Sequence, residues 1–312
     1  MGSDKEPRNR EATVRYKRLN LRRRSPLAAV SVVAVAAAAF AGISASEAPA
    51  SPRAASSAPA ESAIVHRLTT CLAPGQAKPT VVLVHGAWAD ASSWSGEVAA
   101  LQTAGYDARA IANPLQNLTT DSQYVADYLK GMHGPVVLVG HSYGGSVISN
   151  AAAGLANVKR LVYVDAFAPA PGQTTAQLSG AGSVVTTMRP AELFDTTMAP
   201  NGTPELYLKK GIFIHHFASD LPPSKAKVLW ASQRGSSAAA LDTPSKAAAW
   251  KTIPSWYFIS TGDQIITPAS ELAMARRAHS HITMFHGGSH LTLISHPNAV
   301  TSVIASAICS LR

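Results

Sequence analysis

The sequence predicts an α/β fold with a mostly parallel sheet of about six strands, helices on both faces and a helical cap insertion. From about residue 80 onward, short β-branched runs alternate with segments of helical period, which is typical of βαβ units. The alternation stops at about residues 171–252, where large apolar side chains are scattered among helical and loop patterns. We therefore expect a single α/β domain with a cap inserted after the fourth strand.

The expected strands are runs rich in β-branched and aromatic residues, at Thr80–Val84, Asp107–Ile111, Pro135–Val139, Arg160–Val164, Ser255–Ser260 and His281–Phe285. The expected helices lie between them, at Ser93–Thr103, Ser122–Met132, Ser142–Leu155, Pro268–Ala278 and Pro297–Cys309.

A nucleophilic serine is predicted at the end of the third strand. The sequence there reads Gly-His-Ser-Tyr-Gly, from Gly140 to Gly144, between a β-branched run and a helix-compatible segment. This G-x-S-x-G pattern is a sharp strand-to-helix turn that exposes the serine hydroxyl, and glycine is needed where a Cβ would clash. Ser142 is therefore the candidate nucleophile, although a glycine turn before an ordinary helix would give the same string.

A serine needs a base to take its proton and an acid to orient that base. Asp263 follows the predicted strand Ser255–Ser260, and His290 follows the last predicted strand in a glycine-rich turn. Enzymes whose nucleophilic serine lies at such a strand-to-helix turn have the chain order Ser, Asp, His. This chain has the same order in Ser142, Asp263 and His290. Asp165, which also ends a strand, and His286 are the alternatives for the acid and the base.

Backbone amides that bind an oxyanion are expected from two loops. One is the N–H of Ala87, in the loop after the first strand, and the other is that of Tyr143, the residue after the nucleophile. Gly86 lets the first loop approach the serine, and His85 is expected to order that loop. His141 is expected to point away from the cleft.

Several segments resemble the α/β-hydrolases, closest to a bacterial esterase-like branch related to plant methyl esterases and hydroxynitrile lyases. They are VLVHGAWADASSW, VVLVGHSYGG, LVYVDAFAP, IPSWYFISTGDQIITP and GGSHLTLISHP, and the resemblance spans about Thr80 to Leu311. It implies an α/β-hydrolase fold and an ester-hydrolase-like site but leaves the substrate open, because this fold hosts many chemistries. We expect a serine enzyme that cleaves small-molecule carboxylic esters and uses no cofactor.

Other activities are compatible with the same residues. A perhydrolase or haloperoxidase-type reaction could use this triad, as could C–C bond cleavage. The lyases, however, carry a lysine directly after the catalytic histidine, and this chain has Leu291 there. The alternative from another class is a catalytically silent binding protein. His215 and His216 are adjacent in the sequence, so their side chains should point in different directions, and no metal site is expected.

The cap is expected to form an apolar acyl or alcohol pocket over the serine. The candidate substrate-binding residues are Trp88 from the first loop and Phe213, Phe217 and Trp230 from the cap. The alternative is that these cap residues belong to the core of additional helices.

The N-terminus has the order of an export signal: a basic segment that ends in three arginines, an alanine-rich apolar run and small-residue sites. We therefore expect residues 1–45 to be a signal peptide or an N-terminal anchor, and 46–78 to be an Ala/Ser/Pro-rich linker and extension. Residues 79–312 would form the hydrolase domain. Export by the Sec or the twin-arginine route predicts a secreted protein that contacts a membrane only if this segment stays uncleaved.

Charge argues against a nucleic-acid partner. The formal net charge is +9, but residues 1–50 hold nine of the 27 basic and only four of the 18 acidic residues. The remainder has a net charge of only +4 and no basic cluster interleaved with aromatic residues.

The two cysteines lie near the two ends of the expected domain. Cys71 precedes the first strand, and Cys309 lies near the end of the last helix. An even number of cysteines in an exported chain predicts a disulfide. Two separately buried thiols are the alternative.

Overall fold

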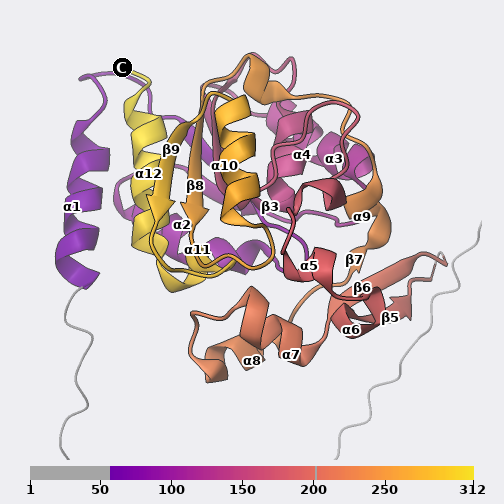
Figure 1. The fold of residues 1–312 in the computed structure, drawn as a ribbon. Coiled ribbons are helices and arrows are strands. Elements are labelled where there is room, and N and C mark those ends of the chain that lie inside the picture. Colours follow the sequence, from indigo (N-terminus) through magenta and orange to yellow (C-terminus); the bar gives the residue numbers. More distant parts are fainter. Residues whose placement is uncertain (1–56, 201) are drawn as a thin grey trace, which may run out of the picture. The chain divides into compact units, whose positions relative to one another are not determined.

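The computed structural model describes residues 57–200 and 202–312 (Figure 1). The predicted signal segment at 1–45 and the first part of the extension, up to residue 56, lie outside the described residues. Within 57–200 and 202–312, no helix combines the length and apolar character needed to cross a membrane.

A six-stranded, fully parallel sheet forms the centre of the domain, as predicted. Its strand order is β2-β1-β3-β4-β8-β9. The connections between these parallel strands pass over the two faces of the sheet. All seven residues of β3 are buried, because a central parallel strand is covered on both faces. The strands are β1 (Thr80–Val84), β2 (Ala108–Ile111), β3 (Val136–Ser142), β4 (Val158–Ala166), β8 (Ser255–Ser260) and β9 (His281–Phe285).

Two groups of helices cover the sheet (Figure 1). On one face lie α2 (Ser95–Thr103), which follows the 3₁₀ turn η1 (Ala91–Trp94), α11 (Thr292–Ser295) and α12 (Pro297–Cys309). On the other lie α3 (Leu118–Lys130), α4 (Tyr143–Ala151) and α10 (Pro268–Arg277). The helix starts follow from capping: Asn117 accepts a hydrogen bond from the Thr120 amide, and Thr267 does the same for Ser270.

A helix that the sequence did not predict, α1 (Ser57–Thr70), occupies part of the stretch expected to be linker. It packs beside α12 (Figure 1), and the Tyr106 hydroxyl donates to the Leu68 carbonyl at its end. A disulfide joins Cys71 to Cys309, with 5.2 Å between the two Cα atoms. The helix is thus held on the domain by packing and by a covalent link that follows its last residue.

Between β4 and β8 the chain forms a cap beyond the carboxyl ends of the strands, towards which the arrowheads of β8 and β9 point (Figure 1). The cap is not only helical, as the sequence suggested, because it also contains a three-stranded antiparallel sheet. Its strands are β5 (Phe194–Met198), β6 (Pro204–Leu208) and β7 (Ser236–Ser237). Its short helices are η2 (Ala176–Leu178), α5 (Val184–Thr187), α6 (Pro190–Leu193), α7 (Lys210–Ile212), η3 (Phe213–Phe217), α8 (Pro223–Ala231), α9 (Ala238–Asp242) and η4 (Ala249–Lys251).

Candidate functional site

Ser142 lies at the turn from β3 into α4, with a backbone φ of +53° and a ψ of −125°. A residue with a side chain rarely adopts this conformation, which costs about 1–3 kcal/mol and needs support from its surroundings. The surroundings are tight: a Cβ at Gly140 would lie 2.6 Å from the carbonyl oxygen of Gly144. The glycine pattern therefore fits the sharp turn that the sequence predicts, and the turn directs the serine out of the sheet.

Three side chains from separate loops form one hydrogen-bonded chain. His290 Nε2 lies 2.8 Å from Ser142 Oγ, and His290 Nδ1 lies 2.6 Å from Asp263 Oδ2. All three residues are buried. This order of contacts is the one by which an acid orients a base and the base takes a serine proton.

Backbone amides hold the Asp263 carboxylate. Its Oδ1 accepts hydrogen bonds from the N–H groups of Ile265, at 2.7 Å, and Ile266, at 3.0 Å. Its Oδ2 remains for the histidine, so the carboxylate and the ring are fixed relative to one another. Of the alternatives, His286 is exposed, and Asp165 is buried but bonded to Ser260 rather than to the histidine.

The loop after β1 lies directly against the serine. A Cβ at Gly86 would lie 2.6 Å from the Cβ of Ser142, so only glycine permits this approach, and Ala87 follows it into the pocket wall. His85 ties the loop to the rest of the domain: its Nε2 accepts from the Asn113 amide at 2.9 Å, and its Nδ1 lies 2.8 Å from the Gly86 carbonyl. Burial is the main cause that lowers the pKa of His85 to about 4, so the ring is neutral and donates through Nδ1.

Tyr143 is the first residue of α4, so its backbone N–H has no acceptor within the helix. Its side chain points elsewhere: the hydroxyl donates to Asp121 Oδ2 at 2.7 Å, and the Gln116 amide also donates to that carboxyl group. Burial and the nearby Asp121 raise the Tyr143 pKa well above its usual value, which keeps the phenol protonated. No local pattern singles out Asp121 of α3, which holds this end of α4 through the Tyr143 hydroxyl.

His141, expected to point away from the cleft, is fully buried behind the histidine. Its Nε2 donates to the carbonyl oxygen of His290 at 2.8 Å, and the two rings lie 4.8 Å apart. Burial lowers its pKa well below the usual value, so the ring stays neutral. His141 therefore supports the backbone of His290.

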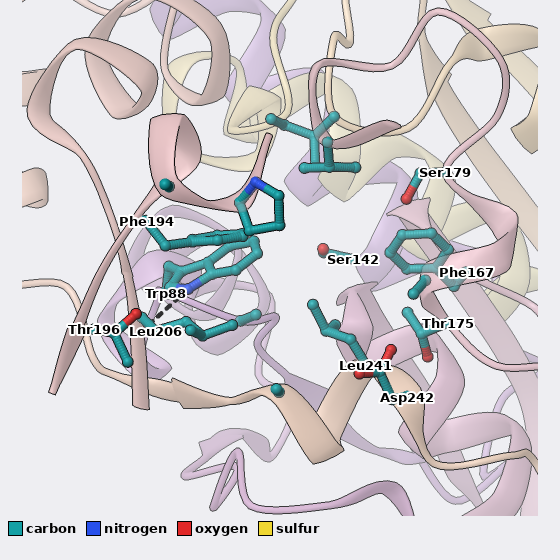
Figure 2. Close-up of a pocket in the computed structure, with 17 residues that line it drawn as sticks. Trp88, Ser142, Phe167, Thr175, Ser179, Phe194, Thr196, Leu206, Leu241 and Asp242 are labelled. Atoms are coloured by element: carbon teal, nitrogen blue, oxygen red, sulfur yellow. Dashed lines mark hydrogen bonds between the residues drawn. The ribbon is translucent and has the colours of Figure 1, made fainter. Parts of the chain in front are cut away.

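A pocket of about 580 Å³ opens over the serine (Figure 2). Trp88 and Phe194 stack on one side of Ser142, with ring centroids 5.4 Å apart, and Phe167 and Thr175 lie on the other side. The lining is mostly apolar and consists of Ala87, Trp88, Ser142, Phe167, Thr175, Ala176, Ser179, Val185, Pro190, Ala191, Phe194, Thr196, Leu206, Ala238, Leu241, Asp242 and Ile265.

Of the four candidate substrate-binding residues, the structure places only Trp88 in the wall of this pocket. Phe213 and Phe217 are fully buried, and the Phe217 ring packs 5.0 Å from that of His290. Trp230 donates its indole N–H to the Leu208 carbonyl inside the cap. These three cap residues therefore belong to the packing around the histidine and within the cap, the alternative that the sequence left open.

The cap supplies an aspartate that the sequence did not single out. Asp220 accepts hydrogen bonds from the hydroxyl groups of Ser289 and Ser295, which flank the histidine in sequence, and His296 Nδ1 lies 3.6 Å away. The cap is thus hydrogen-bonded to the loop that carries His290, which we call the histidine loop. This arrangement depends on tertiary packing between segments about 70 residues apart, so no local pattern predicts it.

In the described part of the chain, one group has the spacing of metal ligands: the buried carboxyl groups of Asp165, Asp263 and Glu271, whose oxygens lie within 4.8 Å of one another. Both oxygens of Asp263 already accept hydrogen bonds, and Asp165 accepts from the Ser260 amide. Two of the three carboxyl groups, those of Asp165 and Asp263, are therefore already engaged in hydrogen bonds with the protein.

Comparison with known proteins gives a consistent result. The model of the alpha/beta hydrolase family matches residues 81–303. "Alpha/beta hydrolase nvfD" from Aspergillus novofumigatus is 25% identical over 252 residues, which is 74% of this chain and 96% of that protein. "Carbendazim hydrolyzing esterase" from a Nocardioides species is 34% identical over 110 residues, 30% of this chain and 44% of that protein.

Solved structures share the fold. An extracellular alpha/beta-hydrolase from a Paenibacillus species is 24% identical, with a TM-score of 0.62 over 73% of this chain and 98% of that one. Polyneuridine aldehyde esterase is 16% identical, with a TM-score of 0.62 over 75% of this chain and 99% of the other.

Proposed function

The chain belongs to the alpha/beta hydrolase family, and from that premise we propose that it is an exported serine esterase that cleaves carboxylic esters. Ser142 is the nucleophile, His290 the base and then the acid, and Asp263 the group that orients the histidine. The observation that carries the proposal is the hydrogen-bonded chain of these three buried side chains, with links of 2.6 Å and 2.8 Å.

The reaction follows from this geometry. As Ser142 Oγ attacks the ester carbonyl, its proton passes to His290 Nε2, and Asp263 stabilises the imidazolium that forms. The N–H groups of Ala87 and Tyr143 bind the negative oxygen of the tetrahedral intermediate. The histidine then gives its proton to the departing alcohol, and a water molecule activated by the same ring releases the acyl group.

The pocket lining indicates the class of ester. Its walls are apolar and aromatic, and Asp242 is the only charged side chain among the lining residues that the structure describes. A carboxylate or phosphate on the substrate would find no cationic partner in these walls. We therefore propose a neutral substrate with a bulky apolar group. The name of the Nocardioides relative, an esterase, agrees with this class of reaction.

Export is part of the proposal. It rests on the order of basic, apolar and small-residue segments in residues 1–45 and on the disulfide, which is typical of oxidising compartments. Fractionation of a producing culture, with N-terminal sequencing of the active protein, tests it. Activity that remains with an intact N-terminus in the cytosol would refute export without touching the esterase proposal.

Ser142→Ala tests the nucleophile. Without the attacking oxygen, turnover of p-nitrophenyl esters should fall on the order of 10⁴-fold, and a fluorophosphonate probe should no longer label the protein. Ser149→Ala is the matched control, because Ser149 is a buried serine of the helix that follows Ser142, and its hydroxyl donates to the Gly145 carbonyl. Ester hydrolysis by Ser142→Ala at the rate of the control would overturn the mechanism.

A further inference from the structure

The carboxyl group of Asp165 is connected to the histidine loop by a chain of hydroxyl groups. Ser260 Oγ lies 2.9 Å from Asp165 Oδ2 and 2.7 Å from Thr292 Oγ1. Thr292 Oγ1 lies 2.6 Å from the carbonyl oxygen of Ser289, the residue before His290. All five residues are buried, so these contacts are made away from bulk water.

The three contacts need three protons. The Ser289 carbonyl can only accept, so Thr292 donates to it. Thr292 has then used its one proton, and Ser260 must donate to Thr292. Ser260 has no second proton for the contact with Asp165, and both of its distances are those of full O–H···O bonds. The missing proton must come from the carboxyl group.

We propose that Asp165 is a protonated carboxylic acid that donates to Ser260, and that this chain of hydroxyl groups fixes the loop that carries His290. Asp165 is then a positioning residue for the proposed esterase reaction, on which this part of the inference rests. Its other oxygen, Oδ1, accepts from the Ser260 amide at 2.7 Å, as a carboxylic acid also can.

The groups around Asp165 agree with the neutral form. The titratable groups that interact electrostatically with Asp165 are all acids. They are Asp263 after β8, Asp220 from the cap, Glu271 on α10 and the phenol of Tyr257 on β8. Burial, followed by the charge of Asp263, raises the pKa of Asp165 well above its usual value. Three adjacent buried carboxyl groups cannot all be charged.

Asp263 is the member of this group that carries the charge. It accepts two backbone N–H bonds and faces His290 Nδ1, whereas neither Glu271 oxygen has a hydrogen-bond partner. The proton on Asp165 therefore leaves one anion beside the histidine instead of two, and that anion is the one that touches the ring.

A direct test is the infrared absorption of protonated carboxyl groups in the purified protein at neutral pH. Asp165→Asn should remove one band in the C=O region typical of a buried carboxylic acid. This measurement does not depend on esterase activity, so it can fail independently of the proposed function. An unchanged spectrum in that region would show that Asp165 is ionised and would overturn the proposal.

Asp165→Asn should also preserve the positioning, because its amide can donate to Ser260 Oγ while its oxygen accepts from the Ser260 amide. It should keep most of the turnover and the wild-type pH profile, whereas Asp165→Ala should lower kcat about 10- to 100-fold with little change in KM. If Asp165 were instead an anion, Asp165→Asn would displace the acid limb of the profile or lose as much activity as Asp165→Ala.

Thr292 offers a second pair of variants in case Asp165→Ala does not fold. Thr292→Ser keeps the hydroxyl group, and Thr292→Val keeps the shape but removes it. We expect Thr292→Ser to retain most of the turnover and Thr292→Val to lose about tenfold in kcat. Equal turnover in the two variants would show that the hydroxyl chain does not position the histidine.

Discussion

At the scale of single residues, the site depends on histidines that stay neutral. His85 and His141 are buried beside Ser142 and His290. His85 Nε2 accepts a hydrogen bond from the Asn113 amide, which requires an uncharged ring, and burial disfavours the charged form of His141. Their pKa values are lowered by burial, to about 4 for His85. This has a consequence for stability at acid pH, because an unfolded chain protonates its histidines at a pKa of about 6.5.

We expect the free energy of unfolding to fall as the pH drops from about 6.5 towards 4. In that window the unfolded chain binds a proton at His85 and the native state does not, so protonation favours unfolding. The contribution of His85 is about 3 kcal/mol, from the shift of its pKa from 6.5 to about 4. Urea unfolding at pH about 7 and about 4.5 measures this change. Between the two pH values, the free energy of unfolding should decrease less in His85→Gln than in the wild type.

The control is His133→Gln, since His133 is exposed. In this variant the free energy of unfolding should decrease between the two pH values by as much as it does in the wild type. A decrease in His85→Gln as large as that in His133→Gln would show that His85 takes up its proton in the native state over the same pH range as in the unfolded chain.

The catalytic candidates were predictable at this scale, and their supports were not. A sequence motif and chain order single out Ser142, Asp263 and His290, because the turn at each strand end is a local feature. Asp165 and Asp220 make their contacts with distant segments. The sequence offers Asp165 only as an alternative acid and does not single out Asp220, so these contacts are seen only in the folded structure.

At the scale of elements, Trp88 connects the loop after β1 with the cap. Its φ of +57° is a left-handed conformation that non-glycine residues rarely adopt. The indole N–H donates to the Leu206 carbonyl of β6 at 3.0 Å, and the ring stacks on Phe194 of β5. The cap sheet therefore helps to hold the loop from which the Ala87 amide comes.

Trp88→Phe should lower kcat/KM of the proposed ester hydrolysis about five- to tenfold, because it removes this hydrogen bond, worth about 1 kcal/mol, and loosens the loop. Trp230→Phe is the matched control: it removes an indole N–H bond to Leu208 of the same strand, outside the pocket wall. Steady-state kinetics and urea unfolding of both variants test the link.

The two variants should lose similar stability, while kcat/KM of Trp230→Phe should stay within about twofold of the wild type. Equal kinetic losses would mean that the cap as a whole, rather than Trp88, supports the loop.

The main sheet was predictable because its central strands are continuous apolar runs bounded by turns. The structure has two strands of the sheet with the expected bounds, Ser255–Ser260 and His281–Phe285, and also the last helix, Pro297–Cys309. The cap strand β5 was missed because four of its five residues are exposed, so burial imposes no alternation on its sequence. Helix α1 was missed because it lies in a stretch interpreted as an Ala/Ser/Pro-rich extension, and its contacts with α12 and the disulfide beside its end are tertiary features.

At the scale of the molecule, the two ends of the sheet have different tasks. The candidate triad lies on loops after β3, β8 and β9, at the carboxyl edge, where parallel α/β sheets bind ligands. The disulfide lies at the other end of α12, a helix of 13 residues and therefore about 20 Å long. Stability and chemistry are thus separated along the strand direction.

The double variant Cys71→Ser/Cys309→Ser should lose stability and keep activity. The bridge closes a loop with a sequence separation of 238 residues, for which chain entropy gives about 5.5 kcal/mol as an upper figure. We expect a clearly lower Tm, with turnover at room temperature within about twofold of the wild type. Thermal unfolding with and without reductant checks this.

Reductant should lower the Tm of the wild type to that of the serine variant and leave the variant unchanged. A wild-type Tm that does not respond to full reduction would show that the bridge adds nothing to stability.

The lining of the pocket also bears on how a catalytic cycle would end. Hydrolysis turns a neutral ester into a carboxylate, and the one charge among the described lining residues, Asp242, is also negative and exposed. The walls that accept the substrate would therefore repel the acid formed from it, by a modest force that salt screens. Departure of the acid product would then be favoured, and accumulated product would compete poorly with fresh ester for the pocket.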